Sequence, residues 1–350
     1  MRYKLFGQHT GLRVSELVLG TANFGMRWGH GAELGEARRI FDAYAGAGGN
    51  FIDTANGYQD GQAEEYLGQL LSGRRDEFVL ASKYTVKTDA SAGILTTGNS
   101  RQAMVASVEA SLKRLNTDRI DLYWAHVCDG VTPLDEIVRG FDDLARAGKI
   151  LYAGLSDFPA WRVARAATLA ELRGSVPIAG LQLEHSLVER TVEQELLAAG
   201  QALGLGIVAW SPLGGGMLTG KYREPRSEKG RDEGFAGAAF QAENSAQRTA
   251  ILDTLIEVAQ ALEVTPAEVA IAWVAAKGSL PIIGPRTLAQ LENNLGAASV
   301  KLTAEQLTRL DRVSAVPLTF PHTVLNDPRI QDLYTGGKFD RIDAPAGTVA

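Results

Sequence analysis

Eight short apolar runs, separated by segments of helical period, constrain the fold of this chain more than any other feature. Each run is brief and apolar on both faces, which is typical of a strand buried in a parallel sheet. Eight strand–helix units close most readily into a barrel, so the sequence predicts an α/β fold of the (β/α)8 TIM-barrel type. The runs cover residues 17–21, 50–55, 78–83, 120–126, 150–156, 178–184, 206–211 and 280–284.

Helix signals lie between several of these runs. Residues 35–49 have helical period and end in glycines, which favour a helix C-terminus. A second helix is expected over residues 99–115 behind Ser100, a good N-cap. A third is expected over residues 133–149, with Pro133 at its first helical position.

Three segments fall outside the alternation. Residues 2–16 predict an N-terminal β-hairpin, because two short β-prone runs flank a turn. Residues 212–244 form a long Gly- and charge-rich loop after the seventh strand, which we interpret as a lid. The C-terminal tail, from about residue 314 to residue 350, is expected to be extended.

Composition limits the class of protein. With 350 residues, 45% hydrophobic and 22% charged, the chain fits one barrel domain over residues 1–350 whose core spans about 17–300. The single cysteine excludes an intramolecular disulfide, and the net charge of −6 comes without the basic stripe that a nucleic-acid surface needs. No secretory signal or long apolar span is visible. We therefore expect a cytoplasmic protein that binds a small molecule and neither nucleic acid nor a membrane; its oligomeric state cannot be predicted.

Polar residues close three consecutive strands, where chemistry resides in such barrels. Asp53 ends the second strand and leads to Tyr58, Lys83 ends the third, and His126 ends the fourth. A buried Lys83 would lower the pKa of the Tyr58 phenol by stabilising phenolate. Taken singly, each residue also fits a structural role, as a turn former, a packed aromatic, a snorkelling lysine or a core histidine. Together they predict a site that protonates an oxygen while hydride reaches the adjoining carbon.

The stretch SPLGGGMLTGKY, residues 211–222, nearly spells a nucleotide-triphosphate loop. It reads G-x-x-x-x-G-K from Gly215 to Lys221, but Tyr222 stands where a Mg²⁺-binding Ser or Thr is required. The spacing leaves two interpretations: a loop that holds a phosphate without Mg²⁺, or a flexible glycine-rich connection.

An ordered series of motifs extends from about residue 17 to residue 300: DTANGY, SKY, DLYWAH, GLSDF, LQLEHSLVER, SPLGGGMLTGKY and GPRTLAQLENN. In this order they resemble the aldo-keto reductases, and among them the microbial aryl-alcohol-dehydrogenase-like and potassium-channel-β-like branches. The resemblance implies a barrel that binds NADP(H) without a Rossmann domain, in keeping with the lack of a G-x-G-x-x-G motif opening a βαβ unit. It also implies a catalytic role for Asp53, Tyr58, Lys83 and His126.

The resemblance further implies a set of cofactor contacts, in which the loop of residues 211–222 lies along the pyrophosphate. Arg286 matches the position that reads the adenosine 2′-phosphate, so we predict NADPH over NADH. The implied cofactor-binding residues are Gly20, Thr21, Asp53, Ser156, Asp157, Gln182, Trp210, Ser211, Leu213, Gly215, Lys221, Gly284, Arg286, Gln290 and Asn294.

Two positions depart from the family pattern. Many relatives carry glycine directly after the tyrosine, whereas this chain has Gln59, which we expect to alter the substrate rim. Asp157 stands where asparagine is common, and an ionised carboxylate can only accept hydrogen bonds.

The preferred hypothesis is an NADPH-dependent reductase of aldehydes or ketones, reversible toward alcohol oxidation, with Tyr58 as general acid. We expect an aromatic or polycyclic carbonyl in a pocket walled by Met26, Trp28, Tyr84 and Trp124. One alternative is a binding subunit that senses cofactor redox state. Another is a metal-dependent hydrolase, which five histidines and no H-x-H pair make less favourable, so no metal site is predicted.

Overall fold

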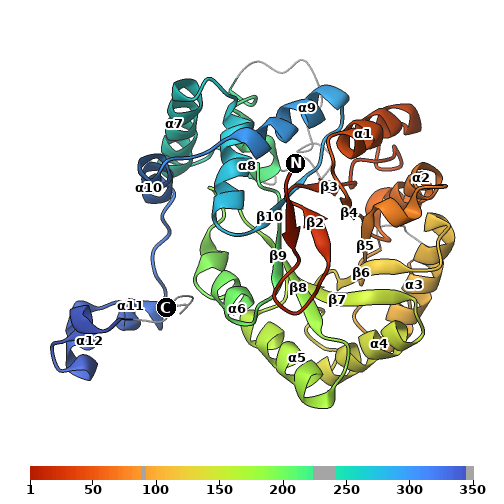
Figure 1. Cartoon of the computed structure of the whole chain (residues 1–350), viewed down its shortest axis with the longest axis horizontal. Helices are drawn as coiled ribbons and strands as arrows, with labels where there is room; N and C mark the ends of the chain where they lie inside the picture. The colour runs from red at the N-terminus through yellow and green to blue at the C-terminus, as the bar shows by residue number, and fades with distance from the viewer. Residues whose placement is uncertain (88–91, 224–240, 344–350) are drawn as a thin grey trace.

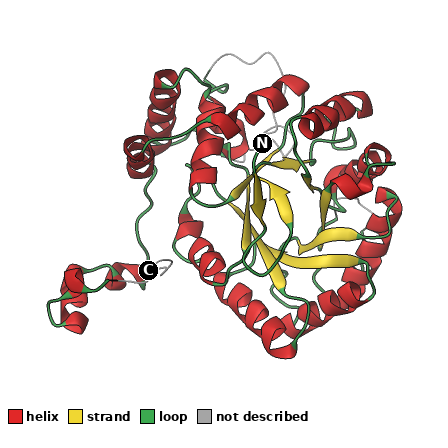
Figure 2. Ribbon diagram, in the orientation of Figure 1, coloured by secondary structure: helices red, strands yellow, loops and turns green. Residues whose placement is uncertain are grey.

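Within residues 1–87, 92–223 and 241–343, which the computed structural model describes, eight parallel strands form a closed barrel. Around the barrel the strands follow the order β10–β3–β4–β5–β6–β7–β8–β9, so neighbours in sequence are neighbours in space (Figures 1 and 2). Their positions confirm the predicted fold class and each predicted strand. The bounds are β3 Val18–Gly20, β4 Phe51–Asp53, β5 Val79–Tyr84, β6 Ile120–Ala125, β7 Ile150–Ser156, β8 Ile178–Glu184, β9 Gly206–Trp210 and β10 Leu280–Ile283.

Helices surround the strands as an outer layer (Figure 2). The N-cap predicted at Ser100 is confirmed, because its side chain accepts a hydrogen bond from the Ala103 amide. Pro133 was expected as the first helical residue but is the N-cap, since its backbone stays extended with ψ 134°. The helices are α1 Leu34–Gly46, α2 Gln62–Leu70, α3 Arg101–Leu115, α4 Leu134–Arg146, α5 Ala160–Arg173, α6 Leu196–Ala202, α7 Ala246–Ala261, α8 Pro266–Ala276, α9 Leu288–Gly296 and α10 Ala304–Val313.

The predicted N-terminal hairpin is confirmed and closes one end of the barrel. Its strands β1 (Tyr3–Leu5) and β2 (Arg13–Ser15) pair antiparallel and cross the barrel in the foreground of Figure 1. Between them Phe6 is fully buried and packs edge-on against Phe51 at 5.7 Å and Trp124 at 6.4 Å. Gly180 makes room for these rings, because a Cβ there would come within 2.7 Å of Phe6. The barrel interior is therefore filled at this end.

The C-terminal tail is not extended as predicted. Beyond α10 it forms two short helices, α11 (His322–Leu325) and α12 (Pro328–Thr335), on an arm that projects away from the barrel (Figure 1). The missed signal was local: Asp327 caps α12, Pro328 is its first residue, and Gly336 ends it in the left-handed conformation.

The loop after β9 begins with a 3₁₀ helix, η4 (Gly214–Thr219). The predicted lid falls mostly on residues 224–240, which lie outside the described residues. In the described ranges no single helix is long and apolar enough to cross a membrane, and α7 with α8 passes that test only as a pair bent by 99°.

Candidate active site

A cavity of about 830 Å³ opens at the carboxyl ends of the strands, opposite the hairpin. Its volume lies in the upper part of the ~300–1,000 Å³ range of small-molecule sites. Of the predicted residues, those that line it are Gly20, Trp28, Asp53, Tyr58, His126, Ser156, Asp157, Gln182, Trp210, Ser211, Leu213, Gly215, Lys221, Gly284, Arg286, Gln290 and Asn294.

Lys83 lies behind the cavity wall, fully buried, and joins two of the predicted catalytic residues. Its ammonium donates to the Asp53 carboxylate, to the Thr54 carbonyl at 2.9 Å and to the Tyr58 hydroxyl at 2.9 Å. All three N–H donors of the lysine are thereby used. Lys83 is 25 to 30 positions along the chain from these partners, and they meet because β4 and β5 are neighbours in the barrel.

The charge on Lys83 is maintained despite its burial. Burial acts against an ammonium, but the Asp53 carboxylate and the hydrogen bond to the Tyr58 oxygen outweigh that effect and raise the pKa of Lys83 above its ordinary value. Asp53 is held in turn by Gln182, whose Nε2 donates to Oδ1 at 2.9 Å. The arrangement places a fixed positive charge beside the Tyr58 hydroxyl.

His126 faces the same hydroxyl from the end of β6. Its ring lies edge-on to that of Tyr58, with centroids 5.8 Å apart. Burial, and then the positive charge of Lys83, lower the pKa of His126 to about 3, so the imidazole is neutral at physiological pH. Its Nδ1 is buried and has no hydrogen-bond partner among the described residues. Because His126 lines the cavity, its neutral ring is available there as a hydrogen-bonding group.

Asp157 and Trp210 form a second polar group across the cavity. Trp210 Nε1 donates to Asp157 Oδ1 at 3.1 Å. Burial raises the pKa of Asp157 to about 6, although Trp210, Lys83 and Ser156 lower it in part. The Ser156 hydroxyl is near that carboxyl but makes no well-formed hydrogen bond within the described part of the chain. Ser156 thus lines the cavity and carries a hydroxyl with no partner in the described part of the chain.

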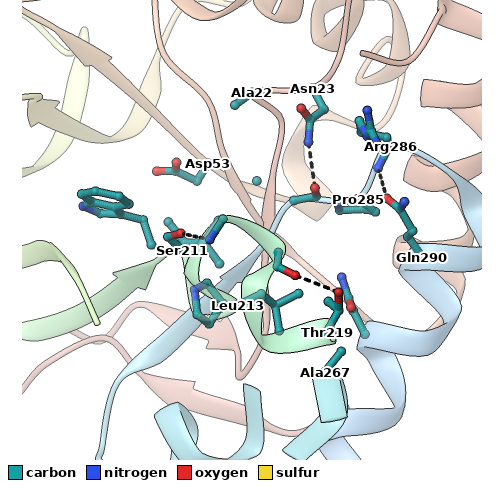
Figure 3. A pocket seen from close by; sticks show the side chains of 18 of the residues that line it. Ala22, Asn23, Asp53, Ser211, Leu213, Thr219, Ala267, Pro285, Arg286 and Gln290 are labelled. Atoms are coloured by element: carbon teal, nitrogen blue, oxygen red, sulfur yellow. Dashed lines mark hydrogen bonds between the residues drawn. The ribbon is translucent and has the colours of Figure 1, made fainter. Parts of the chain in front are cut away.

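The glycine-rich loop forms another wall, seen in Figure 3 between Ser211 and Thr219. Gly214, Gly215 and Gly216 all have positive φ, which glycine adopts without steric cost. Ser211 also has a φ of 54°, and its Oγ accepts from the Gly215 amide at 2.9 Å. Thr219 Oγ1 donates to the Gly216 carbonyl at 2.8 Å. The shape of the loop beside the cavity is therefore fixed by hydrogen bonds within the loop itself.

The far end of the cavity joins the first and last barrel loops (Figure 3). Asn23 Nδ2 donates to the Gly284 carbonyl at 2.8 Å, and the Arg286 amide donates to Gln290 Oε1 at 2.8 Å. Gln290 and Asn294 are four residues apart and lie on one face of α9, toward the cavity.

Five predicted site residues do not line the cavity. Lys83 contacts it through its partners. Thr21 is buried, and its amide and hydroxyl donate to the Asp53 carbonyl at 3.0 and 3.1 Å, so it supports β4 from behind. Met26 is 40% exposed outside the cavity.

The prediction that Tyr84 and Trp124 form aromatic walls of the substrate pocket is wrong. Tyr84 points outward into the helix layer, where it stacks on Tyr123 at 5.5 Å and meets Phe141 edge-on. Trp124 points into the closed end of the barrel beside Phe6. Both are fully buried, so neither ring reaches a substrate.

Several lining residues were missed by the sequence reasoning. Asn23 follows β3 and could have been found by the rule that singled out Asp53. Thr265, Pro266 and Ala267 come from the start of α8, whose capping box with Glu268 is readable as T-P-x-E. Only the packing of α8 against η4 brings that helix start to the cavity. Asn293 joins Asn294 on α9.

The alternative metal site does not assemble. Among the described residues no group of three His, Cys, Asp or Glu side chains could hold a metal ion. His185, which a metal-dependent hydrolase would have to use together with His126, is buried against Trp273 and hydrogen-bonded to Glu193 at 2.9 Å instead.

A family model, described as the aldo/keto reductase family, matches residues 16–315. The chain belongs to the aldo/keto reductase family. It is 38% identical over 328 residues to an uncharacterized oxidoreductase of Bacillus subtilis (91% of this chain, 97% of that protein). It is 32% identical over 345 residues to an NADP(+) aryl-alcohol dehydrogenase of Phanerodontia chrysosporium (93% and 89%). A norsolorinic acid reductase of Aspergillus flavus is 31% identical over 350 residues (95% and 86%).

Membership of the aldo/keto reductases and the names of these relatives support an oxidoreductase that reduces a small-molecule carbonyl compound. Proteins of this family typically use NAD(P)H. The resemblance drawn from the ordered motifs is thereby confirmed.

Proposed function

We propose that this aldo/keto reductase is an NADPH-dependent enzyme that reduces an aldehyde or ketone to the alcohol, reversibly, with Tyr58 as the general acid. The observation that carries the proposal is the contact of 2.9 Å between the Lys83 ammonium and the Tyr58 hydroxyl at the edge of the cavity. A bound nicotinamide would supply hydride to the carbonyl carbon. The residues of the chain would then have to supply only a proton and the position of the carbonyl.

Tyr58 is proposed to donate its proton to the carbonyl oxygen, because it alone of the four residues combines an O–H donor with a direct contact to a buried cation. Lys83 would stabilise the negative charge left on the phenol, and Asp53 would keep Lys83 charged. Neutral His126 would orient the carbonyl by a hydrogen bond from its ring without exchanging a proton.

The cavity fits a nicotinamide dinucleotide on several counts. The unsatisfied Ser156 hydroxyl, with Asp157 and Gln182, offers the donors and acceptors that an amide needs. Glycine backbone in the loop of residues 211–222 lines the middle of the cavity, and Arg286 lines its far end. A guanidinium suits a phosphate dianion, which supports NADPH over NADH.

An aromatic or polycyclic carbonyl is the proposed substrate class. Trp28 and Tyr58 meet edge-on at 6.3 Å in the cavity wall, and Trp210 adds a third aromatic ring to the lining. Flat aromatic surfaces favour stacking with flat ligands. The relatives named for aryl alcohols and norsolorinic acid support the same class.

The experiment is to follow NADPH absorbance with a panel of aromatic, aliphatic and sugar carbonyls, and to repeat it with NADH. We expect oxidation of NADPH, fastest with aromatic carbonyls. Tight NADPH binding without turnover on any carbonyl would contradict the proposal and favour the redox-sensing binding subunit instead.

A further inference from the structure

Gln59, the residue that departs from the family pattern, is fully buried although its side chain is polar. Its amide spans the loop of residues 22–32, called here the first loop, which follows β3. Nε2 donates to the carbonyls of Ala22 at 3.2 Å and His30 at 3.0 Å, while Oε1 accepts from the Trp28 amide at 2.9 Å. One side chain thus binds both ends and the middle of the first loop.

The first loop is shaped to accept this side chain. A Cβ at Gly25 would approach the Cβ of Gln59 to 2.8 Å, and one at Gly31 would approach its Nε2 to 3.2 Å. Both glycines have positive φ. The loop backbone therefore closes directly on the glutamine, with no space for other side chains between them.

Trp28 connects this arrangement to the active site. Its ring lines the cavity, edge-on to Tyr58, and its Nε1 donates to Asp60 Oδ1 at 3.4 Å. Gln59 is the residue between Tyr58 and Asp60, so three consecutive residues contact Trp28 through its ring, its backbone amide and its indole N–H. This short segment holds the indole beside Tyr58, while Gln62 at the start of α2 holds the preceding turn by accepting from the Met26 and Arg27 amides at 2.7 and 3.2 Å.

We propose that Gln59 is a positioning residue that holds Trp28 beside Tyr58 and thereby sets the preference of the site for flat aromatic carbonyls over small ones. The inference rests on the proposed function and deepens it, because it names what builds the substrate wall. Gln59 acts through the first loop and touches no substrate itself.

The backbone at Gln59 permits a clean test. Its φ of 52° and ψ of 38° are left-handed, a conformation that glycine adopts readily, so Gln59→Gly removes the amide without straining the chain. Gln59→Glu is the isosteric companion: it keeps an acceptor for the Trp28 amide but turns a carboxylate toward two carbonyl oxygens. Gln102→Ala, at an exposed position on α3, is the matched control.

Hydrogen–deuterium exchange over residues 22–32 measures the positioning directly. We expect faster exchange in this segment in both Gln59 variants, with unchanged exchange in the barrel strands, and no change in the control. Equal exchange in wild type and the Gln59 variants would overturn the proposal, whether or not the protein reduces carbonyls.

Kinetics measure the consequence, with 2-naphthaldehyde and propanal as probes. In Gln59→Gly we expect kcat/KM for 2-naphthaldehyde to fall about tenfold, mainly through KM, and that for propanal to change less than about threefold. Trp28→Ala should give the same loss, and the double variant no further loss, because both changes remove one wall. Equal losses for the two aldehydes, or losses that add in the double variant, would overturn the proposal. If wild type reduces neither aldehyde, the proposed function fails for this class and the exchange result alone decides the role of Gln59.

Discussion

At the scale of single residues, the site is built around one buried ammonium. Lys83 has no exposure to solvent, and its donors are divided between a carboxylate, a carbonyl and a phenol. Such a group is stable only while its partners remain, because an uncompensated buried charge is costly. The same dependence ties the chemistry of Tyr58 to the stability of the barrel.

Replacing Tyr58 with phenylalanine removes the proposed acid and leaves the ring in place. We expect turnover to fall by about 10²- to 10⁴-fold, the usual contribution of general acid catalysis, with NADPH affinity unchanged. Steady-state rates and a fluorescence titration of NADPH measure the two quantities. Turnover near the wild-type level would exclude Tyr58 as the acid.

Removing the carboxylate of Asp53 leaves the buried Lys83 ammonium without a counter-charge. Asp53→Ala should lower the free energy of unfolding by about 3–5 kcal/mol, while Asp53→Ala combined with Lys83→Met should recover much of that loss. Urea unfolding of the single and double variants measures both. A double variant no more stable than the single one would contradict the ion pair as the cause.

We expect Asp157, and not His126, to be the active-site group that changes protonation near pH 6. Burial raises the pKa of Asp157 to about 6, whereas His126 stays neutral because its pKa is lowered to about 3. We expect any inflection near pH 6 in the profile of kcat/KM to disappear in Asp157→Asn and to persist in His126→Gln. The opposite result would reverse the assignment.

At the scale of elements, the cofactor end depends on the loop between β10 and α9. The Arg286 amide donates a hydrogen bond to the side chain of Gln290, the third residue of α9. The helix therefore orients the loop that carries the guanidinium. Thr287 caps the same helix by accepting from the Gln290 amide. The phosphate preference is thus a property of a helix start and its loop.

Arg286→Ala should raise KM for NADPH much more than KM for NADH, by tenfold or more in the ratio (about 1.4 kcal/mol), because only NADPH carries the 2′-phosphate. Arg139→Ala, at an exposed position on α4, is the charge-matched control and should change neither constant. Equal effects on both cofactors would defeat the assignment of Arg286.

At the scale of the whole molecule, one carboxyl near the barrel mouth makes stability depend on pH. Glu184, at the end of β8, is partly buried, and burial raises its pKa to about 7 although Gln241 donates to it at 3.1 Å. Between about pH 4 and pH 7 the Glu184 carboxyl therefore stays protonated in the folded protein, whereas in the unfolded chain, with a glutamate pKa near 4.3, it has lost its proton. Stability from this group is present at low pH and falls as pH rises from about 4 to about 7.

Glu184→Gln should remove this pH-dependent loss. We expect its melting temperature to exceed that of wild type near pH 8, by an amount on the order of 1–2 °C, and to match it near pH 4. Thermal unfolding at the two pH values measures the difference. A variant less stable than wild type near pH 8 would show that the ionised carboxylate stabilises the fold.

Most of the architecture could be predicted from the sequence because each strand is a local apolar run between helix signals. The meeting of Asp53, Lys83 and His126 followed as well, since the carboxyl ends of neighbouring parallel strands converge at one end of a barrel. The helices of the tail were also readable, in Asp327 and Pro328, but were overlooked.

Side-chain direction could not be predicted in the same way. All six residues of β5 and all six of β6 are buried, so no alternation of polar and apolar residues shows which of them face the barrel and which the helices. Tyr84 was placed on the wrong side for that reason, whereas Trp124 does face the barrel interior but lies at its closed end, away from the cavity.

The chain alone determined the order of strands, the barrel that they form and the four polar residues gathered at its mouth, because each of these follows from patterns a few residues long. Tertiary structure decided which aromatic rings reach the cavity, how α8 comes to line it, and how Gln59 closes on the first loop. Those features arise from contacts between segments distant in sequence, and no local pattern encodes the direction in which one buried side chain meets another.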